Sequence, residues 1–461
     1  MNCTRKEKVN SYWGTTREHI GAHVGWLGGL VVGWIGGWVE SGKPETITIK
    51  KTVMNNQKLK VLFLSQRFLF PMDTGGKIRT GNILRQLSKR QDITVISNVE
   101  SPRDDAYLGE MDDLCAKFIA VPWQEMPRYT LKFYLKLLWQ SLSRYPISVL
   151  NDYSSELEAA VLEELATQKY DLAICDFLQS TLIFKNVEGV PRLLFQHNVE
   201  ATITRRHLEK AGNPLARLFW HLQHRRMMRH EGEMCRDFDG TIAVSEKDKA
   251  RMEEWFRAEG VFDIPTGVDT DFFRPSEAPE QKQLVFTGSM DWLPNEDAMI
   301  YFIKDIFPLI KQRERDTRLV IVGRRPTPAL ESLVAGREDI ELTGWVEDTR
   351  PYIADSAVYI VPIRIGGGTR MKIYEALAMG KAMVSTSVGA EGLPLEHNKH
   401  ILFADDAQRF AEHVIFLLNN PERRREIGAV ARKYVYDHFR WERVAEVFDE
   451  ICHRVAGMEK D

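Results

Sequence analysis

The chain has 461 residues, which is enough for two or three domains with separate hydrophobic cores. Apolar residues make up 44% and charged residues 28%, and the formal net charge of −3 excludes any general attraction to nucleic acid. The five cysteines contain no CxxC pair, which argues against a zinc site or a disulfide framework and for a reducing compartment. They are Cys3, Cys115, Cys175, Cys235 and Cys452.

The N-terminal residues 1–53 differ from the rest of the chain. Ile20 to Val39 is uncharged over 20 residues, long enough to cross a bilayer, but it holds seven glycines and reads as a tandem octad, VGWLGGLV then VGWIGGWV. Glycine at this density disfavours a helix. Because MNNQKLKVLFLSQ, from Met54, resembles the start of a domain, we expect residues 1–53 to be an over-extended start; a membrane anchor is the alternative.

Beyond Met54, short apolar runs alternate with longer helical patterns, which predicts buried parallel strands joined by helices. The fold class predicted is α/β, with two facing Rossmann-like, doubly wound parallel-sheet domains and a cleft between them. The domains are expected at residues 55–265 and 283–435, with a linker at 266–282 and a C-terminal helix in 436–461 that packs back on the first domain. The expected strands are 59–65, 93–97, 117–121, 171–176, 192–196, 240–245, 283–288, 318–323, 340–344, 357–363 and 382–387.

Ligands of doubly wound sheets bind beyond the carboxyl ends of the strands, so candidate sites are sought just after a strand. The chain offers three such places. Gly75 and Gly76 follow the first strand, His197 follows the strand at 192–196, and the block GGGTRMKIYEALAMG follows the strand at 357–363.

The third place, within PIRIGGGTRMKIYEALAMG at 362–380, carries the strongest signal. Glycines 366–368 let the backbone approach a ligand and turn its N–H groups toward it, at the positive end of the helix predicted at 372–379. Arg370 and Lys372 add full charges, and Glu375 lies one turn deeper, where a carboxylate suits the hydroxyls of a ribose. The alternative is a glycine turn before a solvated, charged helix start.

His197 also has two interpretations. A single histidine after a strand is often a core residue with satisfied hydrogen bonds. Its place at the carboxyl end of a strand, beside Asn198 and Glu200, favours a functional role in positioning and in stabilising an oxocarbenium-like sugar, rather than as a general base.

At this point the chain resembles the retaining nucleotide-sugar glycosyltransferases of family 4, which have the GT-B fold. The resemblance runs from about Lys60 to the C-terminal helix, and more narrowly it is to bacterial sugar transferases of exopolysaccharide loci and of the exosortase (PEP-CTERM) system. The motifs that carry it are the Gly75-Gly76 loop, HNVE at His197, AVSE (243–246), IPTGVDTDFF (264–273), TGSMDWLPNEDA (287–298), LTGWVEDTRPY (342–352) and the triple-glycine block.

The resemblance implies a donor-binding second domain and an acceptor-binding first domain. Glu375 would hold the ribose, the amides of Gly367, Gly368 and Thr369 with Arg370 and Lys372 the diphosphate, and the backbone near Trp345 and Val346 the base; Gly288 and Asn295 complete the donor set. Gly75 and Gly76 would approach the donor phosphate or sugar, and His197 the transferred sugar. His197, Arg370 and Lys372 form the expected catalytic set, with no metal and no cofactor.

Two departures from the family pattern matter. Family members commonly carry a second glutamate eight positions before the one at 375, where this chain has Gly367. They also commonly present an Arg and a Lys after the first strand of the second domain, where this chain reads GSMDWLPNEDA. We therefore expect Arg370 and Lys372 to supply the main charge that stabilises the leaving diphosphate.

The expected partners are a nucleotide-sugar donor and a glycan or lipid-linked acceptor, with no nucleic acid. Pro127 to Tyr145 and Thr204 to His230 are basic and aromatic, which suits peripheral contact with an anionic membrane; the alternative is a solvated helix whose apolar side packs on its own sheet. The expected place is the cytoplasm, at the inner face of the plasma membrane. Two other functions stay open, a nucleotide-sugar epimerase of similar build and a catalytically silent nucleotide-sugar-binding protein.

Overall fold

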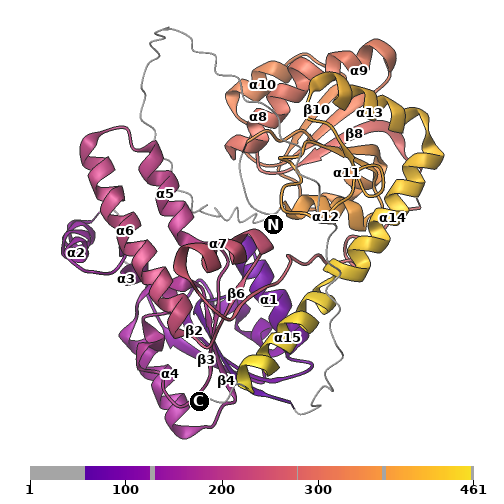
Figure 1. The fold of residues 1–461 in the computed structure, drawn as a ribbon. Coiled ribbons are helices and arrows are strands. Elements are labelled where there is room, and N and C mark those ends of the chain that lie inside the picture. Colours follow the sequence, from indigo (N-terminus) through magenta and orange to yellow (C-terminus); the bar gives the residue numbers. More distant parts are fainter. Residues whose placement is uncertain (1–57, 125–129, 278, 366–369, 458–461) are drawn as a thin grey trace, which may run out of the picture. The chain divides into compact units, whose positions relative to one another are not determined.

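The computed structural model describes residues 58–124, 130–277, 279–365 and 370–457, and within them the chain forms two parallel β-sheets with helices on their faces (Figure 1). The N-terminal segment 1–53 and the amides of Gly367, Gly368 and Thr369 lie outside the described residues. In the described part of the chain, no helix combines the length and the apolar character needed to cross a bilayer.

The first sheet has seven parallel strands in the order β3-β2-β1-β4-β5-β6-β7. The order reverses between β1 and β4, which pair in parallel from Val61 with Leu172 to Ser65 with Asp176. The strands are β1 (Lys60–Arg67), β2 (Asp92–Val99), β3 (Lys117–Pro122), β4 (Leu172–Asp176), β5 (Arg192–Phe195), β6 (Gly240–Ala243) and β7 (Val261–Asp263).

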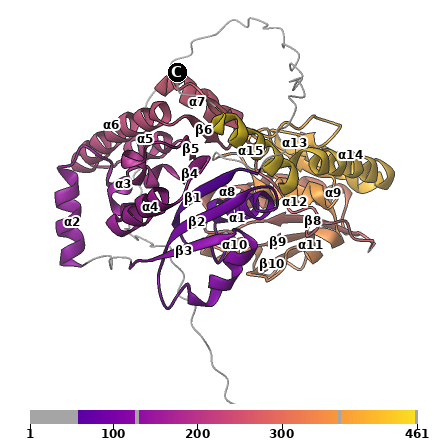
Figure 2. The ribbon, with the colours of Figure 1, turned by 90° about the horizontal axis from the view of Figure 1, so that it is seen from below.

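Alternate residues of β1 enter two different cores, as the twofold period of a strand dictates. Val61 and Phe63 pack with α1 (Gly75–Leu87) and α15 (Trp441–Ala456), whereas Leu62 and Leu64 pack on the other face. Figure 2 shows α1 and α15 on one side of the sheet and α4 on the other. The second face is covered by α4 (Ser155–Thr167), α6 (Pro214–Asp237) and α7 (Glu246–Phe256); the same half of the chain holds α2 (Leu131–Ser141), α3 (Ile147–Asp152) and α5 (Glu200–Lys210).

The last helix, α15, belongs to the first core although it ends the described chain. Its buried residues recur at helical spacing on one face, and the rings of Phe448 and Phe195 meet edge to face with centroids 5.2 Å apart. Trp441 packs against Gly267 so closely that a Cβ at Gly267 would lie 2.3 Å from its ring. The buried face consists of Trp441, Val444, Ala445, Phe448, Ile451, Cys452 and Val455.

The second sheet has six parallel strands in the order β10-β9-β8-β11-β12-β13, and this order reverses between β8 and β11. The strands are β8 (Gln281–Thr287), β9 (Arg318–Val322), β10 (Ile340–Gly344), β11 (Ser356–Val361), β12 (Met383–Ser385) and β13 (Leu402–Phe403). The helices are α8 (Leu293–Tyr301), α9 (Phe307–Arg313), α10 (Pro328–Val334), α11 (Arg350–Asp355), α12 (Met371–Ala378), α13 (Ala407–Asn419) and α14 (Pro421–Phe439).

The prediction of two parallel-sheet α/β domains is confirmed, and every strand expected from the sequence is present. The sequence did not predict β7 and β13, which are only 3 and 2 residues long and too short to show a periodic pattern. The domain boundaries stay predictions.

Phe448→Ala should destabilise the protein by about 3–5 kcal/mol, because the ring is fully buried between α15 and the first sheet. Urea unfolding followed by circular dichroism measures the change. Tyr436→Ala is the matched control, since that ring is exposed on α14 and should change stability by less than about 1 kcal/mol. Equal losses in the two variants would contradict the packing of α15 in the first core.

Candidate functional site

The second sheet changes winding direction between β8 and β11, which pair in parallel through Val358 with Leu284 and Tyr359 with Val285. Ligand sites of doubly wound sheets lie outside the carboxyl ends of the strands at this point. Gly288 follows β8 directly, and the segment after β11 leads into α12, which begins at Met371. The start of α12 and the β8 loop therefore meet at one edge of the sheet.

Lys372 joins the two sides of this edge. Its Nζ donates a hydrogen bond to Asn295 Oδ1 at 2.8 Å and lies 4.0 Å from the centroid of the Phe286 ring. Burial, reinforced by the nearby charge of Arg370, lowers the pKa of Lys372 to about 7, and the Glu375 carboxylate opposes the shift only in part. The hydrogen-bond partner of the ammonium group is thus a neutral amide, and the cation lacks full compensation.

Two glycines make this arrangement possible. Gly288 has a φ of +151°, and a Cβ there would lie 2.6 Å from both Asn295 Nδ2 and Lys372 Nζ. A Cβ at Gly323, after β9, would lie 1.7 Å from the carbonyl oxygen of Gly288. Asn295 Nδ2 donates to the Ser289 carbonyl at 2.8 Å, which orients the amide so that its oxygen faces Lys372. Gly288 and Asn295 therefore both lie beside Lys372, and their role in donor binding stays a prediction.

Arg370 and Glu375 complete the described part of this edge. Arg370 precedes the first turn of α12, is buried, and lies with its guanidinium carbon 5.2 Å from the Trp292 ring centroid. Burial lowers its pKa, as expected for a cation held out of water. Burial also raises the pKa of Glu375 to about 7, with Lys372 acting against the shift. The helix start thus presents two cations, with a carboxyl group one turn inside.

The residues expected to bind the nucleotide base, Trp345 and Val346, are more exposed than Arg370. Trp345 is exposed just after β10, whereas Val346 is half-buried and packs on the core of the second domain. Their roles stay predictions, as do those of Gly367, Gly368 and Thr369.

Sequence reasoning missed the arginines at the neighbouring strand end. Arg324 and Arg325 follow β9; Arg324 Nε donates to Ser289 Oγ at 3.2 Å, and Arg325 pairs with Asp291 Oδ2 at 3.1 Å. The sequence lacks the Arg and Lys expected after β8. In the structure, Arg324 and Arg325 follow β9 instead, and their side chains reach the loop after β8. The signal was the pair of arginines that closes the apolar run RLVIVG.

In the first domain, the backbone of Gly76 and the rings of Phe177 and His197 lie together where the strand order reverses, between β1 and β4. Gly75 and Gly76 begin α1; the position of a Cβ on Gly75 is open, whereas one on Gly76 would lie 2.6 Å from Phe177 Cζ. Phe177 follows β4 with a φ of +66°, an unfavourable conformation for an aromatic residue. Its ring stacks on His197 at 3.9 Å with a 16° interplanar angle. Phe177 therefore packs against both the Gly76 backbone and the His197 ring.

Both ring nitrogens of His197 are engaged by protein groups. Nδ1 lies 3.1 Å from an Arg79 guanidinium nitrogen, and because guanidinium only donates, Nδ1 accepts this bond. Nε2 then carries the proton and donates to Asp176 Oδ1 at 2.8 Å. Burial lowers the pKa of His197 despite Asp176, so the ring is neutral. With both ring nitrogens engaged, this geometry suits a positioning group better than a general base, and the role of His197 stays a prediction.

Two further residues hold this arrangement. Thr80 Oγ1 donates to Asp176 Oδ2 at 3.1 Å, and a second Arg79 nitrogen donates to Thr266 Oγ1 at 2.8 Å. The sequence did not single out Arg79, Thr80, Asp176 or Phe177, although Asp176 ends a predicted strand. Among the described residues, no cluster of three His, Cys, Asp or Glu side chains is placed to hold a metal ion.

Comparison with known proteins shows that this chain is similar to glycosyltransferases. Residues 281–420 match the family model described as Glycosyl transferases group 1. An uncharacterized 44.6 kDa protein in the cps region of Klebsiella pneumoniae is 20% identical over 404 residues, covering 85% of this chain and 99% of the relative. A GDP-mannose-dependent alpha-(1-6)-phosphatidylinositol monomannoside mannosyltransferase of Mycobacterium tuberculosis is 28% identical over 209 residues, which are 40% of this chain and 53% of the relative.

Solved structures agree on the fold. Anabaena HepE in complex with UDP superposes with a TM-score of 0.61 at 13% identity, covering 86% of this chain and 100% of that chain. A glycosyltransferase from Rickettsia africae gives a TM-score of 0.59 at 14% identity, over 87% and 100% of the two chains. The chain therefore has the GT-B fold of glycosyltransferases. The match to the family model covers residues 281–420, which hold the second sheet.

His197 should carry its proton on Nε2 and charge at a lower pH than an ordinary histidine, because burial lowers the pKa of the ring although Asp176 opposes the shift. Nitrogen-15 chemical shifts of labelled histidine, assigned with His197→Gln, report the tautomer directly. Asp176→Asn should shift the tautomer population and weaken the ring stacking. A histidine that charges near pH 6.5, with no tautomer preference, would contradict this geometry.

Lys372→Met should raise the melting temperature of the ligand-free protein, by about 2 to 4 °C per kcal/mol, because it removes a poorly compensated cation. The folded pKa of about 7 lies below the ordinary 10.5, so the unfolded chain holds more protons between these values. The loss of stability that the buried Lys372 charge causes in the wild type is therefore complete below pH 7 and disappears toward pH 10.5. The difference in melting temperature between Lys372→Met and the wild type should decrease over the same pH range.

Differential scanning calorimetry from pH 7 to 10 checks this, and Lys433→Met, exposed on α14, is the control. The same Lys372→Met variant should lose the stabilisation that a nucleoside diphosphate gives the wild type. A variant that is less stable at pH 7, yet still stabilised by the nucleotide, would show that Lys372 is structural.

Proposed function

We propose that the protein is a retaining glycosyltransferase that moves a sugar from a nucleotide diphosphate sugar to a glycan or lipid-linked acceptor, in the synthesis of a bacterial exopolysaccharide or other cell-surface polysaccharide. The observation that carries the proposal is the pair of buried cations, Arg370 and Lys372, at the start of α12, with Glu375 one turn inside. Lys372 is buried beside a neutral amide and Glu375 compensates its charge only in part, so an anion bound here would stabilise it.

The diphosphate of the donor is the anion that fits. Bound beside the first turn of α12, it would accept hydrogen bonds from backbone N–H groups and from both cations. As the glycosidic bond to the donor breaks, charge accumulates on the departing oxygen, and fixed cations in a partly dry site stabilise it without reorganisation. The diphosphate would also raise the pKa of Lys372, so that the lysine carries its proton when the donor is bound.

Glu375 is assigned to the ribose. Burial raises its pKa to about 7, and two hydroxyl donors would stabilise its ionised form. Trp345 and Val346, after β10, are assigned to the base, with Gly367, Gly368 and Thr369 assigned to the phosphates. Gly288 and Asn295 hold Lys372 in place.

The first domain is assigned to the acceptor and the transferred sugar. Gly75 leaves open space at the start of α1, where backbone N–H groups are available to a polar ligand. His197, neutral and fixed by Asp176 and Arg79, would support the wall on which the sugar lies through its stack with Phe177. No metal is assigned to the reaction, because Arg370 and Lys372 carry the charge that a divalent ion would otherwise supply.

The relatives support the proposal. The Klebsiella pneumoniae protein comes from a cps region, and the Mycobacterium tuberculosis relative is named for transfer from GDP-mannose to a phosphatidylinositol mannoside. Anabaena HepE was solved with UDP. We place the reaction in the cytoplasm at the inner face of the plasma membrane, where nucleotide sugars and lipid-linked acceptors meet.

Incubation with radiolabelled UDP- and GDP-sugars, with and without membrane lipid extract, tests the proposal. Transfer of label to lipid or glycan, with retained anomeric configuration by NMR, is the expected result. An altered free nucleotide sugar would indicate an epimerase, and binding without turnover a silent binding protein.

Arg370→Ala and Lys372→Ala should each lower turnover by about 100-fold or more, as removal of an electrostatic transition-state contact does. Lys433→Ala, whose side chain is exposed on α14 and pairs only with Asp437 on the same helix, is the matched control and should keep wild-type turnover. Circular dichroism verifies that the variants fold. Near wild-type transfer by both site variants would refute the assignment.

A further inference from the structure

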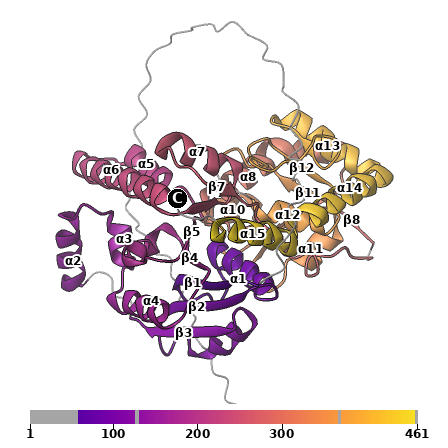
Figure 3. The same cartoon turned by 60° about the horizontal axis from the view of Figure 1, so that its bottom comes forward.

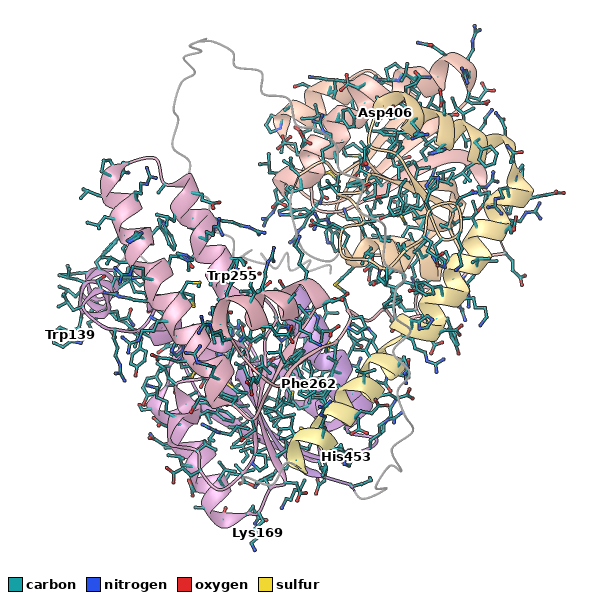
Figure 4. All side chains as sticks on the ribbon, in the orientation of Figure 1. Trp139, Lys169, Trp255, Phe262, Asp406 and His453 are labelled. Atoms are coloured by element: carbon teal, nitrogen blue, oxygen red, sulfur yellow. The ribbon has the colours of Figure 1, made fainter. Side chains whose placement is uncertain are left out.

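Helix α2 exposes an apolar stripe that an ordinary surface helix would bury. Leu131, Leu135, Leu138 and Leu142 recur at intervals of 4, 3 and 4 residues, which places them on one face of a helix. Leu138 is 66% exposed and Leu142 is 79% exposed. Trp139 is 77% exposed, and Figure 4 shows it at the outer edge of the molecule, pointing away from the ribbon. The alternative interpretation, in which this helix packs its apolar side on its own sheet, is therefore wrong for α2.

The first half of α6 repeats the pattern. Leu215, Leu218, Phe219 and Leu222 lie at i, i+3, i+4 and i+7, again one helical face, and all four are exposed, Leu215 by 81%. Two independent helices thus leave their apolar stripes uncovered. Isolated exposed leucines need no explanation, but contiguous sets of this size mark interaction surfaces.

One hydrogen bond joins α6 to α2, and a second joins α6 to α3, the helix that follows α2. A guanidinium nitrogen of Arg226, on α6, donates to the Ser141 carbonyl at the end of α2 at 2.7 Å. Gln223, also on α6, accepts from the backbone N–H of Ile147, which begins α3, at 3.0 Å. Figures 1 and 3 show α2 beside α6. We call the exposed residues of the two helices the α2–α6 apolar face; they are Leu131, Tyr134, Leu135, Leu138, Trp139, Leu142, Leu215, Leu218, Phe219 and Leu222.

Every Asp, Glu, Lys or Arg within residues 131–151 and 214–230 is a Lys or an Arg, although Glu233, one turn further along α6, pairs with Arg229 at 2.7 Å. Neither residues 131–151 nor residues 214–230 contain an Asp or a Glu. Exposed or half-buried cations accompany the apolar residues on both helices. These cations are Lys132, Lys136, Arg144, Arg217, Arg225, Arg226 and Arg229.

We propose that the α2–α6 apolar face docks on an anionic lipid bilayer, with leucine and tryptophan side chains entering the acyl boundary and the lysines and arginines contacting the headgroups. Leucines beside tryptophan, in helical segments whose Asp, Glu, Lys and Arg residues are all Lys or Arg, are the composition of an interfacial membrane helix. A protein partner of mixed charge would match such a rim poorly, and leucine is under-represented among protein–protein hot spots. This proposal rests on the proposed function in one respect: docking would bring the protein to a lipid-linked acceptor.

Vesicle co-sedimentation of the full chain tests the proposal. Phosphatidylcholine vesicles are compared with vesicles of equal parts phosphatidylcholine and phosphatidylglycerol. We expect binding at least about tenfold tighter to the anionic vesicles, decreasing with added salt because screening weakens the cation contacts. Equal partitioning into both vesicles, or none into either, would overturn the proposal.

Variants locate the contact. Leu138→Ser with Leu142→Ser should lower binding about tenfold or more, and Lys132→Gln with Lys136→Gln should remove most of the preference for anionic lipid. The matched control is Phe416→Ser with Val430→Ser, which changes two exposed apolar residues of α13 and α14 and should leave binding unchanged. If the α2 variants bound as tightly as the wild type, or if they only abolished self-association measured by sedimentation, the face would not be a membrane surface.

This test is independent of catalysis. The α2 variants should keep the melting-temperature increase that UDP or GDP gives the wild type, because the face lies outside the nucleotide-binding residues. A chain that binds anionic vesicles but no nucleotide would refute the proposed function and support the membrane surface. A chain that binds nucleotide but no vesicles would refute the membrane surface and leave the proposed function unaffected.

Discussion

The position of the Lys372 ammonium group is the constraint on which the second domain depends. It lies between the loop after β8 and the start of α12, over the Phe286 ring, and its hydrogen-bond partner is the neutral amide of Asn295. The fold maintains it at the expense of stability, since burial lowers its pKa to about 7. Gly288 and Gly323 have no side chains because the two strand ends close around this group. This partly compensated charge is the basis of the proposal that an anion binds here.

The first domain uses the same place in its sheet for a different purpose. At the switch between β1 and β4, Asp176 and Arg79 fix a neutral His197 beneath Phe177, and every polar group of the ring is satisfied by the protein. The second domain keeps charge available to a ligand, whereas the first keeps a ring rigid. This difference matches a donor that carries negative charge and a sugar that needs a shaped, uncharged wall.

Much of the fold could be read from the sequence because strands rich in Val, Ile and Leu recur between helices. The glycines and cations at 366–375 could be read because they follow such a strand. The contacts of His197 could not, because Arg79 and Asp176 lie 118 and 21 residues from it in sequence. Nor could Arg324, which reaches Ser289 from another strand. The α2 stripe was visible as a pattern, but amphipathic spacing does not tell whether a sheet covers the face, and here none does.

The most direct test of this account is the pKa of the Lys372 ammonium group itself. NMR titration of lysine labelled at the ε carbon, with Lys372→Met to assign the signal, measures it in the ligand-free protein and with saturating UDP or GDP. The account predicts a pKa of about 7 without ligand and a rise toward the ordinary 10.5 when the diphosphate binds. A pKa near 10.5 in the ligand-free protein, unchanged by either nucleotide, would contradict it.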